Sequence, residues 1–412
     1  MTSPGMKPPL STRRHDLDWL RVIAFALLIF YHVGMFYVTW DWHVKSTHSS
    51  PLIEPVMALL NPWRLALLFF ISGVALHFAI AKTTIGAFLK NRTVRLFVPI
   101  AFGMLVVVMP QSYFELLYKG EIEPGLIAFY PDYFGLPPGP FSIITPTWNH
   151  LWYVVYILFY TLILAPLFPV LLWLANGPAA RFFAWLERDR SGFLIVAIPV
   201  LPFVAYRLFL DPIFPTTHAL FDDWANHAHS LTIVVLGFLA AKSPAFWSAI
   251  ENGWRKALWI VIAGAVIIVT ARLNYGAVRA SDTVWTLVQV IRVVYAWAMI
   301  VTLLGMAQSY FNRPSRTLSY FSDAIFPYYI LHQTLIVAIG FALLDAGLPA
   351  WLEATLVTSG TVLGCIVGYE LVRRAGPARP LFGLPWKEKA KPAPAPRLLT
   401  THPAAFIASA EP

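Results

Sequence analysis

The sequence has a single cysteine, Cys365, among its 412 residues, so no disulfide can form within one chain. Charged residues are also scarce, at 12% of the chain, whereas soluble domains carry roughly 25%. Hydrophobic residues make up 58% of the chain, and the mean hydropathy is +0.64. This balance excludes a soluble globular protein and indicates an integral membrane protein.

The N-terminus lacks the features of a cleavable signal peptide. Its basic residues precede an apolar run that is too long for a signal sequence, and no small-residue cleavage site follows. The net charge of +9 is typical of nucleic-acid binders, so the positions of the basic residues must decide what it means.

Ten apolar stretches are long enough, or nearly so, to cross the roughly 30 Å hydrocarbon layer as helices. They cover about residues 19–39, 57–81, 95–113, 151–175, 193–211, 229–241, 257–271, 284–308, 322–344 and 351–372, of which the sixth and seventh are short and interrupted. We therefore predict an all-α, polytopic membrane protein. Residues 1–17 form a short N-terminal segment, 18–375 the transmembrane domain, and 376–412 a basic, Pro/Ala-rich tail expected to be disordered.

The lysines and arginines favour one side of the predicted membrane. If the N-terminus is cytoplasmic, the opposite side holds only Lys45, Lys119, Arg272 and Arg279 outside the spans. This is the positive-inside bias, and it predicts ten spans with both termini in the cytoplasm. The positive charge then reflects topology and contact with anionic lipids rather than a nucleic-acid partner.

The first stretch, 18-DWLRVIAFALLIFYH-32, places ionisable residues in an apolar helix. Such residues are costly in a bilayer and usually face the bundle interior or a wet cavity. The helical repeat puts Arg21 and His32 on one face, about 16 Å apart, and Asp18 is spaced to pair with Arg21. His32 is either a candidate general base or a hydrogen-bonded contact between helices. Arg21 and Asp18 on the same face favour the general base, but the residues alone do not decide between the two interpretations.

Three further arginines lie within the predicted spans. Arg64 and Arg207 are close to outer ends, where long side chains can extend to the interface. Arg292 lies near mid-span and requires a partner or a ligand anion. The outer loops at 114–149 and 212–228 combine carboxylates with aromatic residues. This mixture suits sugar-like ligands, but it is more often an interfacial aromatic belt.

Several segments together resemble the membrane-bound acyltransferase 3 family. The spacing of Arg21 and His32 is similar to the first-helix signature of that family. Four further segments match in order: 69-FFISGVALHFA-79, 90-KNRTVRLFVPI-100, 150-HLWYVVYILFY-160 and 318-LSYFSDAIFPYYILHQ-333. The resemblance covers nearly the whole chain except both tails, and it is greatest to the branch of the glucan biosynthesis protein C type. One departure is Tyr153, because many members have a glutamate pair after the His-x-Trp motif.

The resemblance implies an O-acyltransferase of the bacterial inner membrane. The donor would be cytoplasmic acyl-coenzyme A, carrying acetyl or succinyl, and the acceptor a hydroxyl of an extracytoplasmic or lipid-linked glycan. No metal and no tightly bound cofactor are implied. No esterase-like domain follows the last span, so a periplasmic or glycan-synthesis partner is expected if the acceptor must be presented. The oligomeric state stays open.

The resemblance also implies roles for individual residues. His32 would be the general base, with Arg21 and Asp18 beside it, and Arg92 and Arg95 would hold the donor phosphates. The acceptor-site candidates are His150, Trp152, His332, Trp42 and His43, and the anion-binding candidates are Arg64, Arg207 and Arg292. Anchoring at the membrane interface is the alternative for His150, Trp152, Trp42 and His43, and packing between helices is the alternative for His332. A covalent serine intermediate is disfavoured, since Ser72 has no evident base nearby. Ser72 and Gly73 are instead expected to allow close helix packing.

Two other functions fit the same residues. A transporter or flippase of a glycan intermediate would need the polar residues and the outer aromatic loops without any bond chemistry. A non-catalytic assembly subunit would use His32 and Arg21 as packing contacts alone. The first of these is the main alternative to the acyltransferase.

Overall fold

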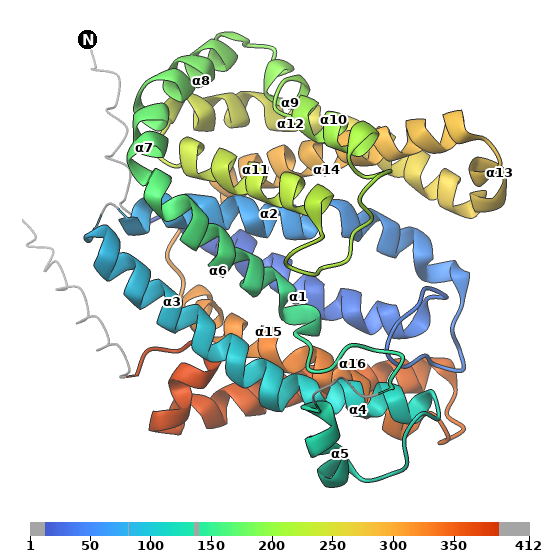
Figure 1. The fold of residues 1–412 in the computed structure, drawn as a ribbon. Helices are drawn as coiled ribbons and strands as arrows, with labels where there is room; N and C mark the ends of the chain where they lie inside the picture. The colour runs from blue at the N-terminus through green and yellow to red at the C-terminus, as the bar shows by residue number, and fades with distance from the viewer. Residues whose placement is uncertain (1–12, 81, 136–139, 387–412) are drawn as a thin grey trace, which may run out of the picture.

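The computed structural model describes residues 13–80, 82–135 and 140–386, and these residues contain helices and no strand (Figure 1). Within these described ranges, eight helical segments are long and apolar enough to cross a membrane. Six are single helices: α1 (His15–Tyr37), α2 (Glu54–Ile80), α12 (Pro244–Leu273), α14 (Asp282–Tyr310), α15 (Arg316–Leu343) and α16 (Ala350–Arg374). The prediction of an all-α, multi-pass membrane protein is confirmed.

The other two long segments are composite. One joins α3 (Ile85–Phe102), η2 (Gly103–Val108) and α4 (Met109–Tyr118). The other runs through η3 (Asn149–Leu151), α6 (Trp152–Leu164), η4 (Ala165–Leu167), α7 (Phe168–Asn176) and α8 (Pro178–Arg188). The short elements include η1 (Pro51–Ile53), α5 (Leu126–Tyr133), α13 (Tyr275–Arg279) and η5 (Gly376–Phe382).

Two predicted spans are shorter than the rest. The stretch 193–211 is divided into α9 (Leu194–Ala197) and α10 (Leu201–Phe209), and 229–241 lies within the seventeen-residue α11 (Trp224–Ala240). The prediction that 257–271 is a short span was wrong, because α12 has 30 residues. That helix continues through the charged Arg255 and Lys256 to Ser243, whose side chain accepts a hydrogen bond from the Phe246 amide.

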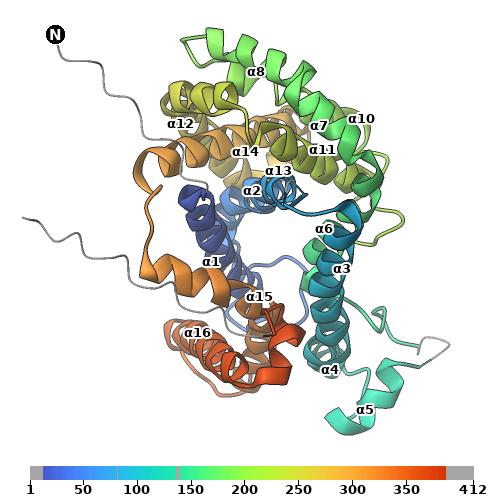
Figure 2. The ribbon, with the colours of Figure 1, turned by 90° about the vertical axis from the view of Figure 1, so that its left-hand side faces the viewer.

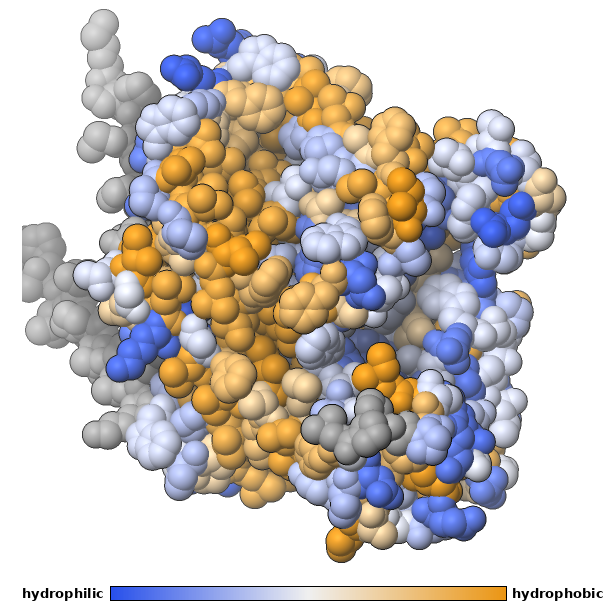
Figure 3. Space-filling view, in the orientation of Figure 1, coloured by the Kyte–Doolittle hydropathy of each residue, from blue (hydrophilic) through white to orange (hydrophobic). Residues whose placement is uncertain are grey.

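The helices surround α1 and α2. Viewed from one end of the bundle, α7, α8, α11, α12 and α14 lie on one side of this pair, and α15 and α16 lie on the other (Figure 2). The segment formed by α3 and α4 lies beside α6 on a third side. The side shown in Figure 3 is covered largely by hydrophobic side chains over α3, α6 and α7, as a lipid-facing surface requires.

Helices α2 and α11 cross at close range. A Cβ atom added at Gly73 would lie 1.9 Å from the carbonyl oxygen of Val234, and one added at Gly237 would lie 2.2 Å from that of Phe70. Only glycine fits at such a crossing, where small residues let two backbones approach. The expected packing role of Gly73 is confirmed.

A π-helical turn, η2, interrupts the third span. The wide turn frees backbone carbonyl groups that must find other donors. The Tyr133 hydroxyl donates to the carbonyl of Met104 at 3.0 Å, that of Tyr130 to Leu105 at 2.6 Å, and that of Thr334 to Val107 at 2.6 Å. The turn is thereby tied to both α5 and α15.

The first part of the predicted tail is folded. Residues 376–386 include η5, where Phe382 is buried and packs against Phe102 of α3. Arg379 donates to the carbonyl of Arg373 at 2.6 Å and to that of Pro385 at 2.8 Å. The prediction of disorder from residue 376 was therefore wrong for this part, because its apolar residues reach a packing surface. Residues 387–412 lie outside the described chain.

Candidate active site

A pair of histidines lies at the centre of the bundle, where α1 meets α15. His332 is fully buried, and its Nδ1 lies 2.7 Å from the carbonyl oxygen of Tyr329 and 3.2 Å from that of Tyr328. Because a carbonyl can only accept, Nδ1 of His332 carries the proton and its Nε2 is an acceptor. Nδ1 of His32 lies 2.9 Å from that Nε2, so His32 is the donor.

This chain of hydrogen bonds fixes the tautomer of His32. With its proton on Nδ1, the neutral ring has a free lone pair on Nε2. His32 is partly exposed, whereas His332 is not. His32 is therefore oriented and left with an unprotonated nitrogen, which is the arrangement that a general base needs.

A third histidine, His150, adjoins the pair. Its ring lies edge-on to that of His332 with the centroids 5.1 Å apart. Its Nε2 donates to the carbonyl of Ile330 at 3.2 Å, and the Tyr329 hydroxyl donates to the carbonyl of His150 itself. His150 is thus held between α6 and α15 beside His332.

Amide side chains connect this cluster to a fourth histidine, His43. The Gln333 amide donates to Nε2 of His43 at 2.8 Å and to the Gln111 oxygen at 3.1 Å. Gln111 in turn lies 3.4 Å from Nδ1 of His150. Nδ1 of His43 is paired with the Glu115 carboxylate. We define the histidine network as His32, His43, His150, His332, Gln111, Gln333 and Glu115.

Arg64 places a positive charge beside this network. Its side chain is 2% exposed and its guanidinium stacks on the Tyr31 ring, 3.8 Å from the centroid. The Nε and Nη1 atoms have no hydrogen-bond partner in the described structure. The charge acts electrostatically on both His32 and His332. Arg64 therefore does not extend to the interface as its sequence position suggested; it is a buried cation next to the histidine pair.

Three other arginines gather near the start of α1. Arg21 pairs with Asp18 at 3.2 Å, as the helical spacing predicted, and Asp18 also binds Arg13 at 3.0 Å. Arg95 interacts electrostatically with Arg21 and Arg92. The Nε atoms of Arg21 and Arg92 are buried without a hydrogen-bond partner among the described residues. The cluster thus has spare capacity for an anion.

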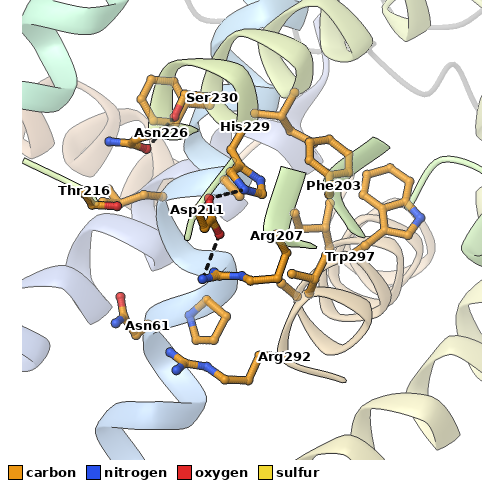
Figure 4. Close-up of a pocket in the computed structure, with 18 of the residues that line it drawn as sticks. Asn61, Phe203, Arg207, Asp211, Thr216, Asn226, His229, Ser230, Arg292 and Trp297 are labelled. Atoms are coloured by element: carbon orange, nitrogen blue, oxygen red, sulfur yellow. Dashed lines mark hydrogen bonds and ion pairs between the residues drawn. The ribbon is translucent and has the colours of Figure 1, made fainter. Parts of the chain in front are cut away.

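Other predicted site residues lie apart from the histidine network. Trp152, Arg207 and Arg292 line a separate cavity between α2, α6, α10, α11 and α14 (Figure 4). Trp42 stays close to the network, since its ring packs against His43 with the centroids 5.3 Å apart. Ser72 bonds the Tyr153 hydroxyl at 2.7 Å, so it contacts a phenol rather than a base.

Two titratable groups in the loops beyond these helices have shifted pKa values. Burial lowers the pKa of Lys45 to about 8, and the nearby Asp41 opposes that shift. Burial also lowers the pKa of His218, against the opposing charge of Asp223. Within the described ranges, no group of three or more histidine, cysteine or acidic side chains is arranged to hold a metal ion.

Gln111, Gln333, Glu115 and the placement of Arg64 were not predicted from the sequence. A lone glutamine in an apolar helix and a glutamine next to His332 were the available signals. The contacts of Gln111, Gln333 and Glu115 with the histidines join residues from 39 to 290 positions apart in the chain, and periodicity within one helix cannot supply them.

Comparison with known proteins adds a family and several relatives. The sequence profile of the family described as "Acyltransferase domain" matches residues 14–370. The proteins named "Glucans biosynthesis protein C" from Escherichia coli (strain K12) and Shigella dysenteriae serotype 1 (strain Sd197) are each 26% identical over 152 residues. These matches span 36% of this chain and 37% of each relative. No solved structure matches the chain.

Proposed function

The chain belongs to the membrane-bound acyltransferase 3 family, and we propose that it moves an acyl group from acyl-coenzyme A to a hydroxyl of a glycan. The glycan acceptor is supported by the name of the relatives, which refers to glucans. The acyl group is acetyl or succinyl, and the enzyme acts in the bacterial inner membrane. The observation that carries this proposal is the fixed tautomer of His32, which leaves Nε2 free to accept a proton.

The reaction needs one proton acceptor and one activated carbonyl. Nε2 of His32 takes the proton of the acceptor hydroxyl while that oxygen forms a bond to the thioester carbonyl carbon. The carbon–sulfur bond then breaks, and the thiolate of coenzyme A takes the proton from the His32 imidazolium. The hydrogen bond from Nδ1 of His32 to His332 orients the ring throughout, as the third member of a catalytic triad orients its histidine.

Arg64 supplies the electrostatic part of this mechanism. Negative charge develops on the thioester oxygen during attack, and a fixed cation in a buried site stabilises such charge strongly. Arg64 is buried, acts on His32 and His332, and has unpartnered guanidinium nitrogens among the described residues.

The donor phosphates bind to Arg21, Arg92 and Arg95. These guanidiniums interact with one another near the start of α1, with Asp18 as the carboxylate bound to Arg21. Guanidinium groups bind phosphate through paired, charge-assisted hydrogen bonds. The acceptor reaches His32 from the opposite direction, past His43, Trp42 and His150.

The test compares two histidine variants of the full chain in lipid nanodiscs. His32→Gln should lower kcat by roughly 10²–10⁴-fold with labelled acetyl- or succinyl-coenzyme A and extracted envelope glycans. The matched control is His77→Gln, because His77 is also buried in an apolar helix but only bonds the carbonyl of Phe238, at 2.9 Å. It should retain transfer.

Two results would contradict the proposal. Full turnover in His32→Gln would show that His32 is not the general base. Absence of any acylated glycan from the wild-type protein, together with donor-independent movement of a glycan across the disc, would favour the transporter alternative. Mass spectrometry of the product identifies the acyl group and the acceptor in the same experiment.

A further inference from the structure

The cavity that holds Arg207 and Arg292 has a volume of about 390 Å³. It lies between α2, α6, α10, α11 and α14, on the far side of Phe69 from the histidine network. The Phe69 ring packs against Tyr153, with the centroids 4.8 Å apart, and Tyr153 packs in turn on Phe25 at 6.1 Å. None of the residues of the histidine network lines this cavity, so the cavity needs its own explanation.

One of the two arginines in the cavity has its charge balanced within the protein. Arg207 binds Asp211 at 2.8 Å, and the second carboxylate oxygen of Asp211 accepts from His229 at 3.2 Å (Figure 4). These three side chains form a closed group on α10, the loop after it and α11. A neutral ligand would suffice here.

Arg292 is different. It enters the cavity from α14, and it forms no ion pair with any residue that the structure describes. Its Nε is buried without a hydrogen-bond partner in those same residues. The nearest charges that act on it are those of Arg207 and Arg272, both positive, with Tyr31 as the one favourable group. Each of these arginines has its own carboxylate, Asp211 and Glu54. The cavity therefore contains one uncompensated cation.

The rest of the lining suits a sugar. Trp152, Trp297 and Phe203 provide aromatic faces, against which the apolar faces of sugar rings pack. Asn61 lies opposite Arg292 in Figure 4 and offers an amide donor and acceptor to the same space. Aromatic faces and an amide recognise a hydroxylated ring, and Arg292 requires one negative charge.

We propose that this cavity binds a sugar phosphate, with the phosphate at Arg292 and the ring against Trp152 and Trp297. The proposal rests on the proposed function in one respect: the bound sugar is the non-reacting end of the acyl acceptor. Binding at such a distance from the reacting hydroxyl selects the acceptor and holds it at the enzyme. The phosphate belongs either to a soluble sugar phosphate or to a sugar linked through phosphate to a lipid.

Equilibrium binding to the full chain in zwitterionic nanodiscs tests this proposal. The probes are glucose 1-phosphate, glucose, inorganic phosphate, and glucose joined through phosphate to a short prenyl chain. Wild-type protein should bind glucose 1-phosphate about tenfold or more tightly than glucose or inorganic phosphate. Arg292→Gln should lose this preference and Arg292→Lys should retain part of it. The control is Arg255→Gln, which removes an equal charge from an arginine stacked on Trp254, at 4.6 Å, outside the cavity.

The outcomes separate the alternatives. Equal affinity for glucose and glucose 1-phosphate, or unchanged affinity in Arg292→Gln, overturns the proposal. Equal affinity for inorganic phosphate and glucose 1-phosphate would show that the cavity binds phosphate without recognising the sugar. Tighter binding of the prenyl-linked probe, lost in Arg292→Gln, identifies a lipid-linked ligand, and tighter binding of glucose 1-phosphate identifies a soluble one. His32→Gln should bind every probe as the wild type does, so a failure of the catalytic proposal leaves this result interpretable.

Discussion

Two groups of polar side chains lie inside the bundle, and they differ in how far their requirements for hydrogen bonds and charge are met. In the histidine network, each ring of His150 and His332 has partners on both nitrogens, and Nδ1 of His43 faces Glu115 while its Nε2 faces Gln333. The cavity on the other side of Phe69 contains the closed Arg207–Asp211–His229 group and the unpaired Arg292.

The difference separates two ways in which buried polar groups act. A network that is complete within the protein fixes tautomers and ring orientations before any substrate arrives. A site with one missing counter-charge is completed only by a ligand that supplies it. The first arrangement suits a reaction centre, and the second suits recognition.

Among the variants that test this difference, the largest expected effect comes from removing His332 from the histidine network. His332→Phe removes the acceptor for Nδ1 of His32, so the ring loses its fixed tautomer, and kcat should fall by about two orders of magnitude. The KM for acyl-coenzyme A should stay unchanged, because His332 is a positioning residue away from the donor arginines. His332→Gln restores an acceptor oxygen and should recover part of kcat. Equal activity of both variants and the wild type would show that His332 only packs.

A smaller effect is expected from changing the charge of the cavity. Asp211→Asn removes the partner of Arg207, so a second arginine becomes available and glucose 1-phosphate should bind several-fold more tightly, with kcat unaffected. The control is Asp222→Asn, because Asp222 bonds only the Thr217 hydroxyl, at 3.2 Å, and does not line the cavity. Weaker or unchanged binding in Asp211→Asn would mean that Arg207 does not face the ligand.

The smallest expected effect concerns pH at the rim of the same cavity. His218 lies against the Trp152 ring, and its lowered pKa means that the unfolded chain binds its proton more readily than the folded protein does. Stability is therefore complete above the ordinary histidine pKa of about 6.5 and decreases as the pH falls below it. The Tm should drop by about a few degrees between pH 7.5 and 5.5.

His218→Asn should remove part of that decrease, because asparagine has no titratable ring and tolerates the left-handed backbone found at this position, where φ is 58°. A pH-dependence of Tm identical to that of the wild type would assign the effect to other groups. Protonation of the histidine network, by contrast, should change kcat rather than Tm.

The sequence predicted those features that depend on spacing within a helix. The period of α1 placed Asp18, Arg21 and His32 on one face, and the pair between Asp18 and Arg21 forms. The order of the motifs identified the family, and it indicated His150 and His332 as site candidates. Hydropathy located the long spans, and it was least accurate at 257–271, where charged residues belong to the same helix as the apolar ones.

The features that remained hidden depend on contacts between helices. Arg64 was expected to reach the interface, and nothing local indicates that Tyr31 on another helix covers it. Gln111, Gln333 and Glu115 were ordinary polar residues until the fold brought α4, α15 and the segment after α1 together. Arg207 was expected to extend to the interface and Arg292 to need a partner or a ligand anion, and among the described residues it is Arg207 that pairs with a carboxylate. That pair is a local one, four residues apart in the chain, and its spacing was already present in the sequence.

The π-helical turn at Gly103–Val108 sets the angular phase of the residues that follow it. A π turn accommodates one residue more than an α turn, and each residue of an α-helix advances the side-chain direction by about 100°. Gln111 comes three residues after this turn, and it reaches His150 and Gln333 from the resulting direction. The extra residue therefore rotates the side chains of the outer part of the third span about the helix axis. A single deletion inside the turn would return the helix to regular winding and turn Gln111 away from the histidines, although every residue of the network would still be encoded.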